Sequence, residues 1–312
     1  MAALRDLTGG LKFPEGPIAM DDGSVVLVEI AAGKVTRVTP DGTVETVAEP
    51  GGGPNGAAIG PDGKLYVANN GASFAYVELP GDMLFPVQPN PDYEGGRIER
   101  IDLASGEVEV LYDSCDGRPL RGPNDLVFDS DGGFWFTDHG IRDHRTADRT
   151  GVFYAKADGS EIREAIAPLD SPNGIGLSPD GSHVYVAETF TCSLWGWRIT
   201  GPGEVEQVPG VFPHGGTFIG RPEGLAGFDS LAVDGEGRVC VATLAVGGAT
   251  GGITSYAPDG SSAEFTDCGD LLTTNICFGG EGLRTAYVTL SATGRLAELD
   301  WPEPGLRLAF TA

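Results

Sequence analysis

The sequence predicts an all-β fold, a six-bladed β-propeller. A turn-and-strand unit recurs six times, at intervals of 40, 69, 49, 56 and 45 residues, and no stretch has the pattern of a long amphipathic helix. Short strands at regular spacing, bounded by turn residues, are typical of propeller blades of four strands each. A closed all-β fold holds 312 residues in one unit. We therefore expect a single propeller domain over residues 1–312.

Each unit is an acidic residue, a glycine and then a short strand rich in Val, Tyr and Phe. The acidic residue followed by glycine favours a tight turn, and the apolar run favours a buried strand. Other turn dipeptides fall between the units, such as Asp41-Gly42, so each unit holds further hairpins. The six expected strands are 24–29, 64–69, 133–138, 183–188, 238–243 and 285–290.

Two segments depart from the repeat. Residues 70–96 form a proline- and aromatic-rich insertion that is too long for a plain hairpin loop, and loops of this kind are often lids or binding loops. Residues 295–312 hold two strand candidates around a Pro-rich turn. We expect one of them to pair with the N-terminal segment, because closing the ring removes a free sheet edge.

Composition excludes several classes of partner. The formal charge of −25 disfavours binding to nucleic acid or to an acidic membrane surface. No run approaches the roughly 18 apolar residues of a membrane span. The N-terminal segment lacks the apolar core of a signal peptide, and the five cysteines fit no zinc motif. We expect a reducing, cytoplasmic location with no nucleic-acid or membrane partner.

An oxygen-bearing side chain stands seven residues before each acidic turn residue. The chain becomes strand-like just after this position, which places it at the start of the innermost strand of each blade. Those starts surround the central channel of a propeller, so the six side chains should converge near the axis. They are Glu15, Asn55, Asn124, Asn173, Asp229 and Thr274.

Two interpretations of these positions stay open. Asn before glycine is a turn former, so Asn55 and Asn173 fit a turn role alone. Glu15, however, is a poor turn residue, and Asp229 precedes Ser. Two carboxylates at one axis repel each other, with no Lys or Arg at this register, and a bound cation resolves the conflict. All-oxygen ligands favour Ca²⁺ first, then Mg²⁺ or Mn²⁺, with Zn²⁺ less expected.

Four motifs, in this order, resemble the SMP-30/gluconolactonase family over about residues 8–310. They are FPEGP (13–17), RGPNDLVFDSDGGFWFTD (121–138), SPNGIGLSPDG (171–181) and FDSLAVDGEGRVCVAT (228–243). The resemblance implies a six-bladed propeller with one divalent metal ion in the axial channel, and many members hydrolyse sugar lactones. It also implies a small-molecule lactone as substrate.

The resemblance assigns roles residue by residue. Glu15, Asn173 and Asp229 match the metal ligands of the family, and Asp229 also matches the usual candidate for the general base. Asn124 matches a position that binds the metal or the substrate in different members. Some animal members have Arg two residues before this Asn, where this chain has Gly122. The nearest arginine, Arg121, is therefore our candidate for substrate binding.

Two further candidates lie in loops. His139 follows an expected strand and either binds substrate or is a hydrogen-bonded structural histidine. His214, Arg221 and Glu223 belong to a Gly-rich segment that either borders the channel mouth or only connects two blades.

Three functions are consistent with these patterns. The first is a lactonase in which a metal polarises the carbonyl and Asp229 takes a proton from the attacking water. The second is a hydrolase of the same fold acting on another ester or a phosphotriester. The third is a non-catalytic propeller in which Ca²⁺ only holds the blades together. Carboxylates together with amides at the axis favour the first two.

Overall fold

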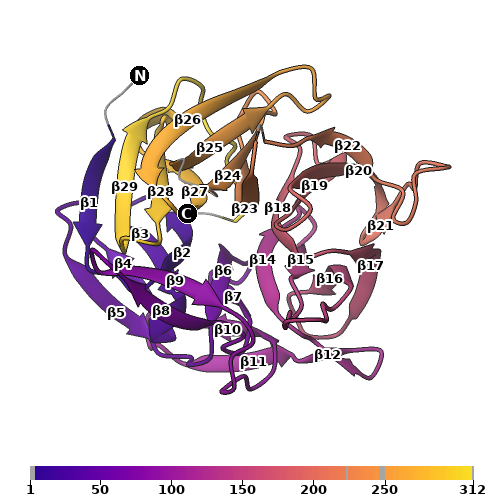
Figure 1. Ribbon diagram of the computed structural model, residues 1–312. Helices are drawn as coiled ribbons and strands as arrows, with labels where there is room; N and C mark the ends of the chain where they lie inside the picture. The colour runs from indigo at the N-terminus through magenta and orange to yellow at the C-terminus, as the bar shows by residue number, and fades with distance from the viewer. Residues whose placement is uncertain (1–3, 223, 246–249, 311–312) are drawn as a thin grey trace.

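The computed structural model describes residues 4–222, 224–245 and 250–310 of the chain. Six antiparallel sheets of four or five strands stand around a central axis like blades (Figure 1). The innermost strand of each sheet contacts the innermost strands of both neighbouring sheets, so these six strands enclose the axis. The six-bladed propeller predicted from the sequence is confirmed.

The blades follow one another along the chain. The first blade contains β2 (Pro14–Ala19), β3 (Val25–Glu29), β4 (Lys34–Val38) and β5 (Val44–Ala48), and the second contains β6 (Pro54–Ile59), β7 (Leu65–Asn69), β10 (Arg97–Ile101) and β11 (Val108–Tyr112). The third contains β14 (Pro123–Phe128), β15 (Gly133–Asp138), β16 (Thr150–Lys156) and β17 (Ile162–Leu169). The fourth contains β18 (Pro172–Leu177), β19 (His183–Glu188), β20 (Ser193–Gly201), β21 (Glu204–Val205) and β22 (Thr217–Gly220).

The fifth blade contains β23 (Ala226–Val233), β24 (Val239–Ala245), β25 (Gly251–Tyr256) and β26 (Ala263–Asp270), and the sixth contains β27 (Thr273–Gly279), β28 (Thr285–Leu290), β29 (Arg295–Asp300) and β1 (Arg5–Gly9). Two short 3₁₀ helices, Ile30–Ala32 and Glu281–Leu283, occur in the described ranges. Within those ranges no helix is long and apolar enough to cross a membrane.

The ring closes through the N-terminal strand. β1 pairs antiparallel with β29, and Arg295 forms an ion pair with Asp6 across this junction at 2.9 Å (Figure 1). The predicted pairing of the two ends of the chain is confirmed. The second C-terminal strand candidate is wrong: both edges of β29 are occupied, by β28 and β1, and residues 305–310 join no sheet. Its residues make only an isolated bridge, between Asp234 and Gly305.

The recurring apolar runs are the second strands of the blades. β3 and β7 are buried along their whole length because both faces pack against other blades. Aromatic pairs fill part of the space between blades, as where Tyr66 meets Phe128 edge-on with ring centroids 5.0 Å apart. Such continuous burial explains why these strands are apolar throughout instead of alternating.

The insertion at 70–96 contains a separate hairpin, β8 (Ala75–Leu79) paired with β9 (Met83–Val87). In Figure 1 it overlies the first two blades, and its Tyr76, Met83 and Leu84 pack on their core. The Leu84 amide donates to the carbonyl of Ala292 at 2.8 Å, which ties the hairpin to the sixth blade. A smaller hairpin joins β12 (Ser114–Cys115) and β13 (Arg118–Pro119).

Candidate functional site

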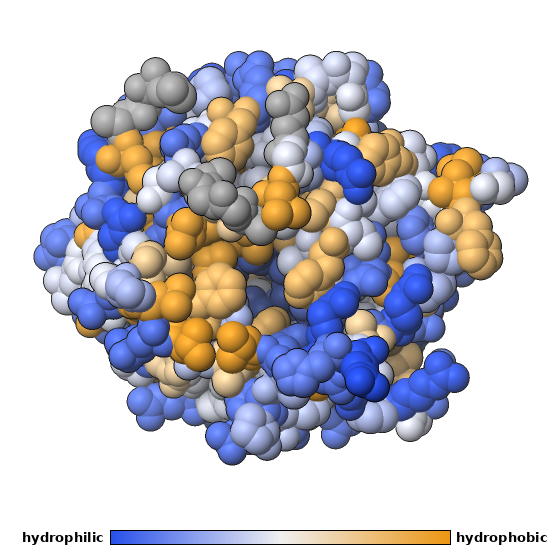
Figure 2. All heavy atoms as spheres, in the orientation of Figure 1, coloured by the Kyte–Doolittle hydropathy of each residue, from blue (hydrophilic) through white to orange (hydrophobic). Residues whose placement is uncertain are grey.

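The six positions that stand seven residues before the acidic turn residues all lie at or near the start of the innermost strands, around the axis. Five of their side chains are buried and Asp229 is half-buried. The propeller face drawn in Figure 2 is hollowed near its centre, and hydrophobic residues border much of the hollow. The structure thus gathers side chains that are up to 259 positions apart in sequence, since Glu15 and Thr274 belong to adjacent inner strands.

A β-bulge interrupts every inner strand at this level. In the third and fourth blades the register shifts between Pro123 and Leu126 and between Pro172 and Ile175, so Asn124 and Asn173 stand within the bulges. The other four inner strands shift at the same level. A bulge places an extra residue in one strand and re-aims its side chain, and bulges are frequent next to active sites.

The bulges also explain the glycines that follow these positions. A Cβ on Gly174 would lie 2.5 Å from the backbone nitrogen of Leu231, and one on Gly16 would lie 2.5 Å from the carbonyl oxygen of Asn55. Neighbouring inner strands therefore approach too closely for a side chain at these points. The interpretation of Asn55 and Asn173 as plain turn residues is wrong, because both lie inside strands.

Buried carboxylates bind the loops that lead to the six side chains around the axis. Three of them end the second strands of their blades, and each accepts a backbone N–H from the residue three positions before a ring member. Charge-assisted bonds of this kind are about twice as strong as neutral ones. The pairs are Lys12 with Glu29, Arg121 with Asp138 and Asp170 with Glu188, each at 2.7 Å.

Three carboxylates share the axis, one more than we predicted. Asp125, the residue after Asn124, is buried beside Glu15 and Asp229 and adds negative charge to both. Burial raises the pKa of Asp229 to about 8, although a hydrogen bond from the Asn173 amide opposes the shift. Burial likewise raises the pKa of Asp125 to about 7. None of the three forms an ion pair within the described part of the chain.

Glu15 has the most enclosed carboxylate. Burial, followed by the negative charge of Asp229, raises its pKa well above the ordinary value. One oxygen, Oε2, accepts from the Gly16 amide and from the Asn275 side chain, both at 2.7 Å. The other oxygen, Oε1, is buried and has no hydrogen-bond partner among the described residues.

The residues at the axis fit a hard cation. The side-chain oxygen of Asn124, like Oε1 of Glu15, is a buried acceptor with no partner in the described ranges. Leaving such an acceptor unsatisfied costs about 1–3 kcal/mol. A cation would satisfy both atoms and offset the charge of the carboxylates. The described chain contains no group of three or more His, Cys, Asp and Glu side chains that could hold a metal, so amide oxygens are needed to complete the ligand set.

The side chains of Asn173 and Thr274 differ in orientation. The Asn173 amide donates to the Thr189 hydroxyl at 3.1 Å, and its oxygen accepts from Ser230 at 3.3 Å, so the amide is fixed in place. The Thr274 hydroxyl bonds back to Thr289 within its own blade at 2.9 Å. It also lies 3.5 Å from the carbonyl oxygen of Pro14 in the first blade, whereas the Glu15 carboxylate is contacted by Asn275.

Arg121 and His139 lie in the third blade. The Arg121 side chain forms an ion pair with Asp148 at 2.8 Å and lies over the ring of Tyr93, so it is engaged away from the carboxylates. His139 follows β15 and is buried between Phe74 and Phe190, with ring centroids 5.8 and 5.9 Å away. Burial lowers the pKa of His139 to about 4, so its imidazole is neutral at neutral pH.

His214 and Arg221, from the Gly-rich segment, make contacts away from the axis. The His214 ring packs against Trp195 and Trp197 with centroids 4.6 and 5.3 Å away, in the outer part of the fourth blade. This contact indicates a packing role for His214. Arg221 donates to the carbonyl of Thr191 at 3.2 Å. Glu223 lies outside the described residues.

Tyr76 is a site residue that sequence reasoning missed. It comes from the insertion hairpin, and its ring lies 5.0 Å from that of Phe13, two residues before Glu15. Burial raises its pKa, and the charges of Glu15 and Asp229 raise it further. Its hydroxyl is buried without a partner in the described ranges. The aromatic character of the insertion was the one signal of this role in the sequence.

Comparisons with known proteins agree with this geometry. A gluconolactonase from Zymomonas mobilis is 26% identical, with 91% of this chain and 78% of that protein aligned. Lactonase drp35 from Staphylococcus aureus is 33% identical over 72% of this chain, but the chain covers only 61% of that protein. The structure of regucalcin, a calcium-binding protein from Agrobacterium tumefaciens, matches with a TM-score of 0.72 at 20% identity, covering 98% of both chains.

A protein-family model also matches most of the chain. The model of the SMP-30/gluconolactonase/LRE-like region aligns with residues 13–292, from the strand that carries Glu15 to the sixth blade. This range contains all six axial positions. The chain therefore belongs to the SMP-30/gluconolactonase family.

Proposed function

We propose that the protein is a divalent-metal-dependent hydrolase that opens a sugar lactone or a related lactone. The observation that carries the proposal is the pair of buried, unpartnered oxygens of Glu15 and Asn124 beside three carboxylates that have no basic partner. The lactonase names of the relatives from Zymomonas and Staphylococcus support the reaction class. A small-molecule substrate and a cytoplasmic location complete the proposal.

Glu15, Asn173, Asp229 and Asn124 would hold one ion. Carboxylate and amide oxygens favour Ca²⁺, with Mg²⁺, Mn²⁺ and Zn²⁺ as alternatives, and calcium binding by the regucalcin neighbour supports this choice. When bound, the ion would polarise the lactone carbonyl and lower the pKa of the attacking water. Neutral Asn124 and Asn173 leave part of its positive charge available to the developing oxyanion.

Asp229 would act as the general base. Its side chain is half-buried, unlike those of the other ring members, so a water molecule can reach it. An interaction with the Asn173 amide favours the ionised form of this carboxylate and lowers its pKa. A carboxylate whose pKa is raised toward the working pH takes up a proton more readily, and such general-base assistance is worth roughly 10²–10⁴-fold.

Substrate contacts would come from Asn124, His139 and Arg121. The neutral imidazole of His139 can donate a hydrogen bond to a lactone oxygen or accept one from a hydroxyl group of the substrate. Arg121 would have to leave Asp148 to reach the substrate, and an exposed ion pair of this kind opposes that by only about 0–1 kcal/mol.

A pH-indicator assay with gluconolactone and other γ- and δ-lactones, with and without EDTA, tests the proposal. We expect acid release that EDTA abolishes and added Ca²⁺ restores. Turnover of a phosphotriester or an aryl ester without any lactone activity would support the second candidate reaction instead. No turnover of any substrate, with one tightly bound Ca²⁺, would reduce the ion to a structural role.

A further inference from the structure

A large cavity lies at the other end of the axial channel. It has a volume of about 900 Å³ and is lined by the ends of the inner strands, such as Ile18, Phe128 and Leu177, and by the turns that follow them. Glu15, Asn124 and Asn173 stand at the starts of those same strands. The cavity therefore opens at the opposite end of the channel and extends inward as far as Asp125 and Asn275, beside the candidate metal centre.

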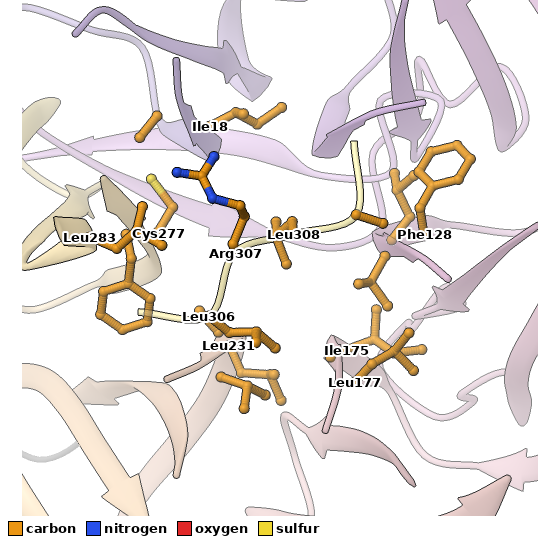
Figure 3. Close-up of a pocket in the computed structure, with 18 of the residues that line it drawn as sticks. Ile18, Phe128, Ile175, Leu177, Leu231, Cys277, Leu283, Leu306, Arg307 and Leu308 are labelled. Atoms are coloured by element: carbon orange, nitrogen blue, oxygen red, sulfur yellow. The ribbon is translucent and has the colours of Figure 1, made fainter. Parts of the chain in front are cut away.

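A C-terminal strap, residues 304–310, crosses the mouth of this cavity. Its first end is fixed by three backbone hydrogen bonds, among them one from the Gly305 amide to the carbonyl of Leu283 at 2.8 Å. Its far end is fixed by the Phe310 ring, which meets Phe128 edge-on at 5.7 Å. Figure 3 shows Leu306, Arg307 and Leu308 spanning the opening between these two ends. These three residues therefore partly cover this end of the channel.

The walls of the cavity are mainly apolar. Six large side chains that Figure 3 places around it are Ile18, Phe128, Ile175, Leu177, Leu231 and Leu283. Small-molecule sites in proteins have volumes of about 300–1,000 Å³ and apolar walls with a few polar groups, which matches this cavity.

The charged groups around the cavity are almost all acidic. Seven carboxylates line it, against one basic side chain, Arg307. Arg307 is exposed and its nearest acidic partner, Asp21, is 3.9 Å away. Asp125 stands at the inner end, while Asp131 and Glu281 stand exposed at the rim. This distribution repels anions and attracts cations.

Aromatic side chains stand in the cavity wall. Trp135 and Phe128 both line the cavity. The face of an aromatic ring attracts an organic cation, and quaternary ammonium groups are often recognised in this way. We propose that the cavity is a binding site for a small organic cation with an apolar body, such as an alkyl amine or a quaternary ammonium compound. This site is independent of the lactone-opening reaction.

Isothermal titration calorimetry of the full-length protein with three probes tests the inference. Octyltrimethylammonium has both the charge and the apolar body, octyl sulfate reverses the charge, and tetramethylammonium lacks the body. We expect one octyltrimethylammonium per chain, bound at least about tenfold more tightly than either of the others. Binding should also change the fluorescence of Trp135. Equal affinity for the cation and the sulfate would overturn the charge argument, and equal affinity for tetramethylammonium would indicate general attraction to an acidic surface.

Two variants locate the binding. Leu177→Trp fills the cavity from a half-buried wall position and should weaken octyltrimethylammonium binding at least about tenfold. Arg307→Glu, at an exposed position where folding is not at risk, should tighten it several-fold. Arg5→Glu makes the same charge change at an exposed position of the outer strand β1, outside the cavity, and is the matched control that should leave probe affinity unchanged. Unchanged affinity in Arg307→Glu, or in a folded Leu177→Trp, would overturn the assignment.

Discussion

Calcium binding should strengthen steeply as the pH rises. Without metal, the folded protein holds protons on Glu15, Asp125 and Asp229 that the unfolded chain releases, because burial raises these pKa values. The stability linked to this proton uptake is fully present below the unfolded pKa near 4 and is lost as the pH rises toward about 8. Calcium replaces those protons, so its stabilising effect has the opposite dependence on pH.

The size of the pH effect on calcium affinity can be worked out from Asp229 alone. With a pKa of about 8, this carboxyl is ionised in about 1% of molecules at pH 6 and in about half of them at pH 8. Displacing that one proton raises the apparent calcium affinity about 50-fold, or about 2.3 kcal/mol. Ionisation of Glu15 in the same range would add to this figure.

Calorimetric titration of metal-free protein with Ca²⁺ at the two pH values measures the ratio directly. Repeating it in buffers of different protonation enthalpy counts the protons released. We expect at least one proton released per ion at pH 6, and a smaller pH dependence in Asp229→Asn. An affinity that stays constant from pH 6 to pH 8, with no proton release, would refute the reasoning that Ca²⁺ binds at these carboxylates.

Three substitutions test other parts of the site. Asp229→Asn should keep the fold by circular dichroism and lower kcat roughly 10²–10⁴-fold, because it removes the base; wild-type kcat would exclude Asp229 from that role. Tyr76→Phe removes a buried, unpartnered hydroxyl, so we expect thermal stability to be retained or to rise and KM to increase, and an unchanged KM would show that the hydroxyl does not reach substrate. Gly174→Ala places a Cβ 2.5 Å from the Leu231 nitrogen and should cost about 1–3 kcal/mol in urea unfolding, whereas Gly9→Ala, which meets only Arg295 at 3.7 Å, should be nearly neutral.

The repeat was readable from the sequence because each blade has the same local chemistry. The acidic-Gly turn and the buried second strand recur in every blade, so the strand at 133–138 could be placed to the residue. The seven-residue offset also located the starts of the inner strands correctly, since turn and strand are joined by a short, regular stretch of chain.

Features that depend on packing between distant segments were not readable. Asp125 reaches the axis because a bulge adds a residue to β14, and no local pattern marks a bulge there. Tyr76 packs on Phe13, near Glu15, because the insertion hairpin docks on the first and sixth blades. The C-terminal segment looked like a strand, but its place in the sheet was already taken by β1. Each of these outcomes was set by competition for space between segments far apart in the chain.

The metal content of the purified protein tests the central claim most directly. After dialysis against limiting Ca²⁺, elemental analysis should find one ion per chain in the wild type and in Asn55→Ala, a ring position to which we assign no ligand role. Glu15→Gln removes the charge of the buried carboxylate and should lower the content well below one ion per chain while the protein stays folded. Full occupancy in folded Glu15→Gln, or no ion in the wild type, would contradict a metal centre at this end of the channel.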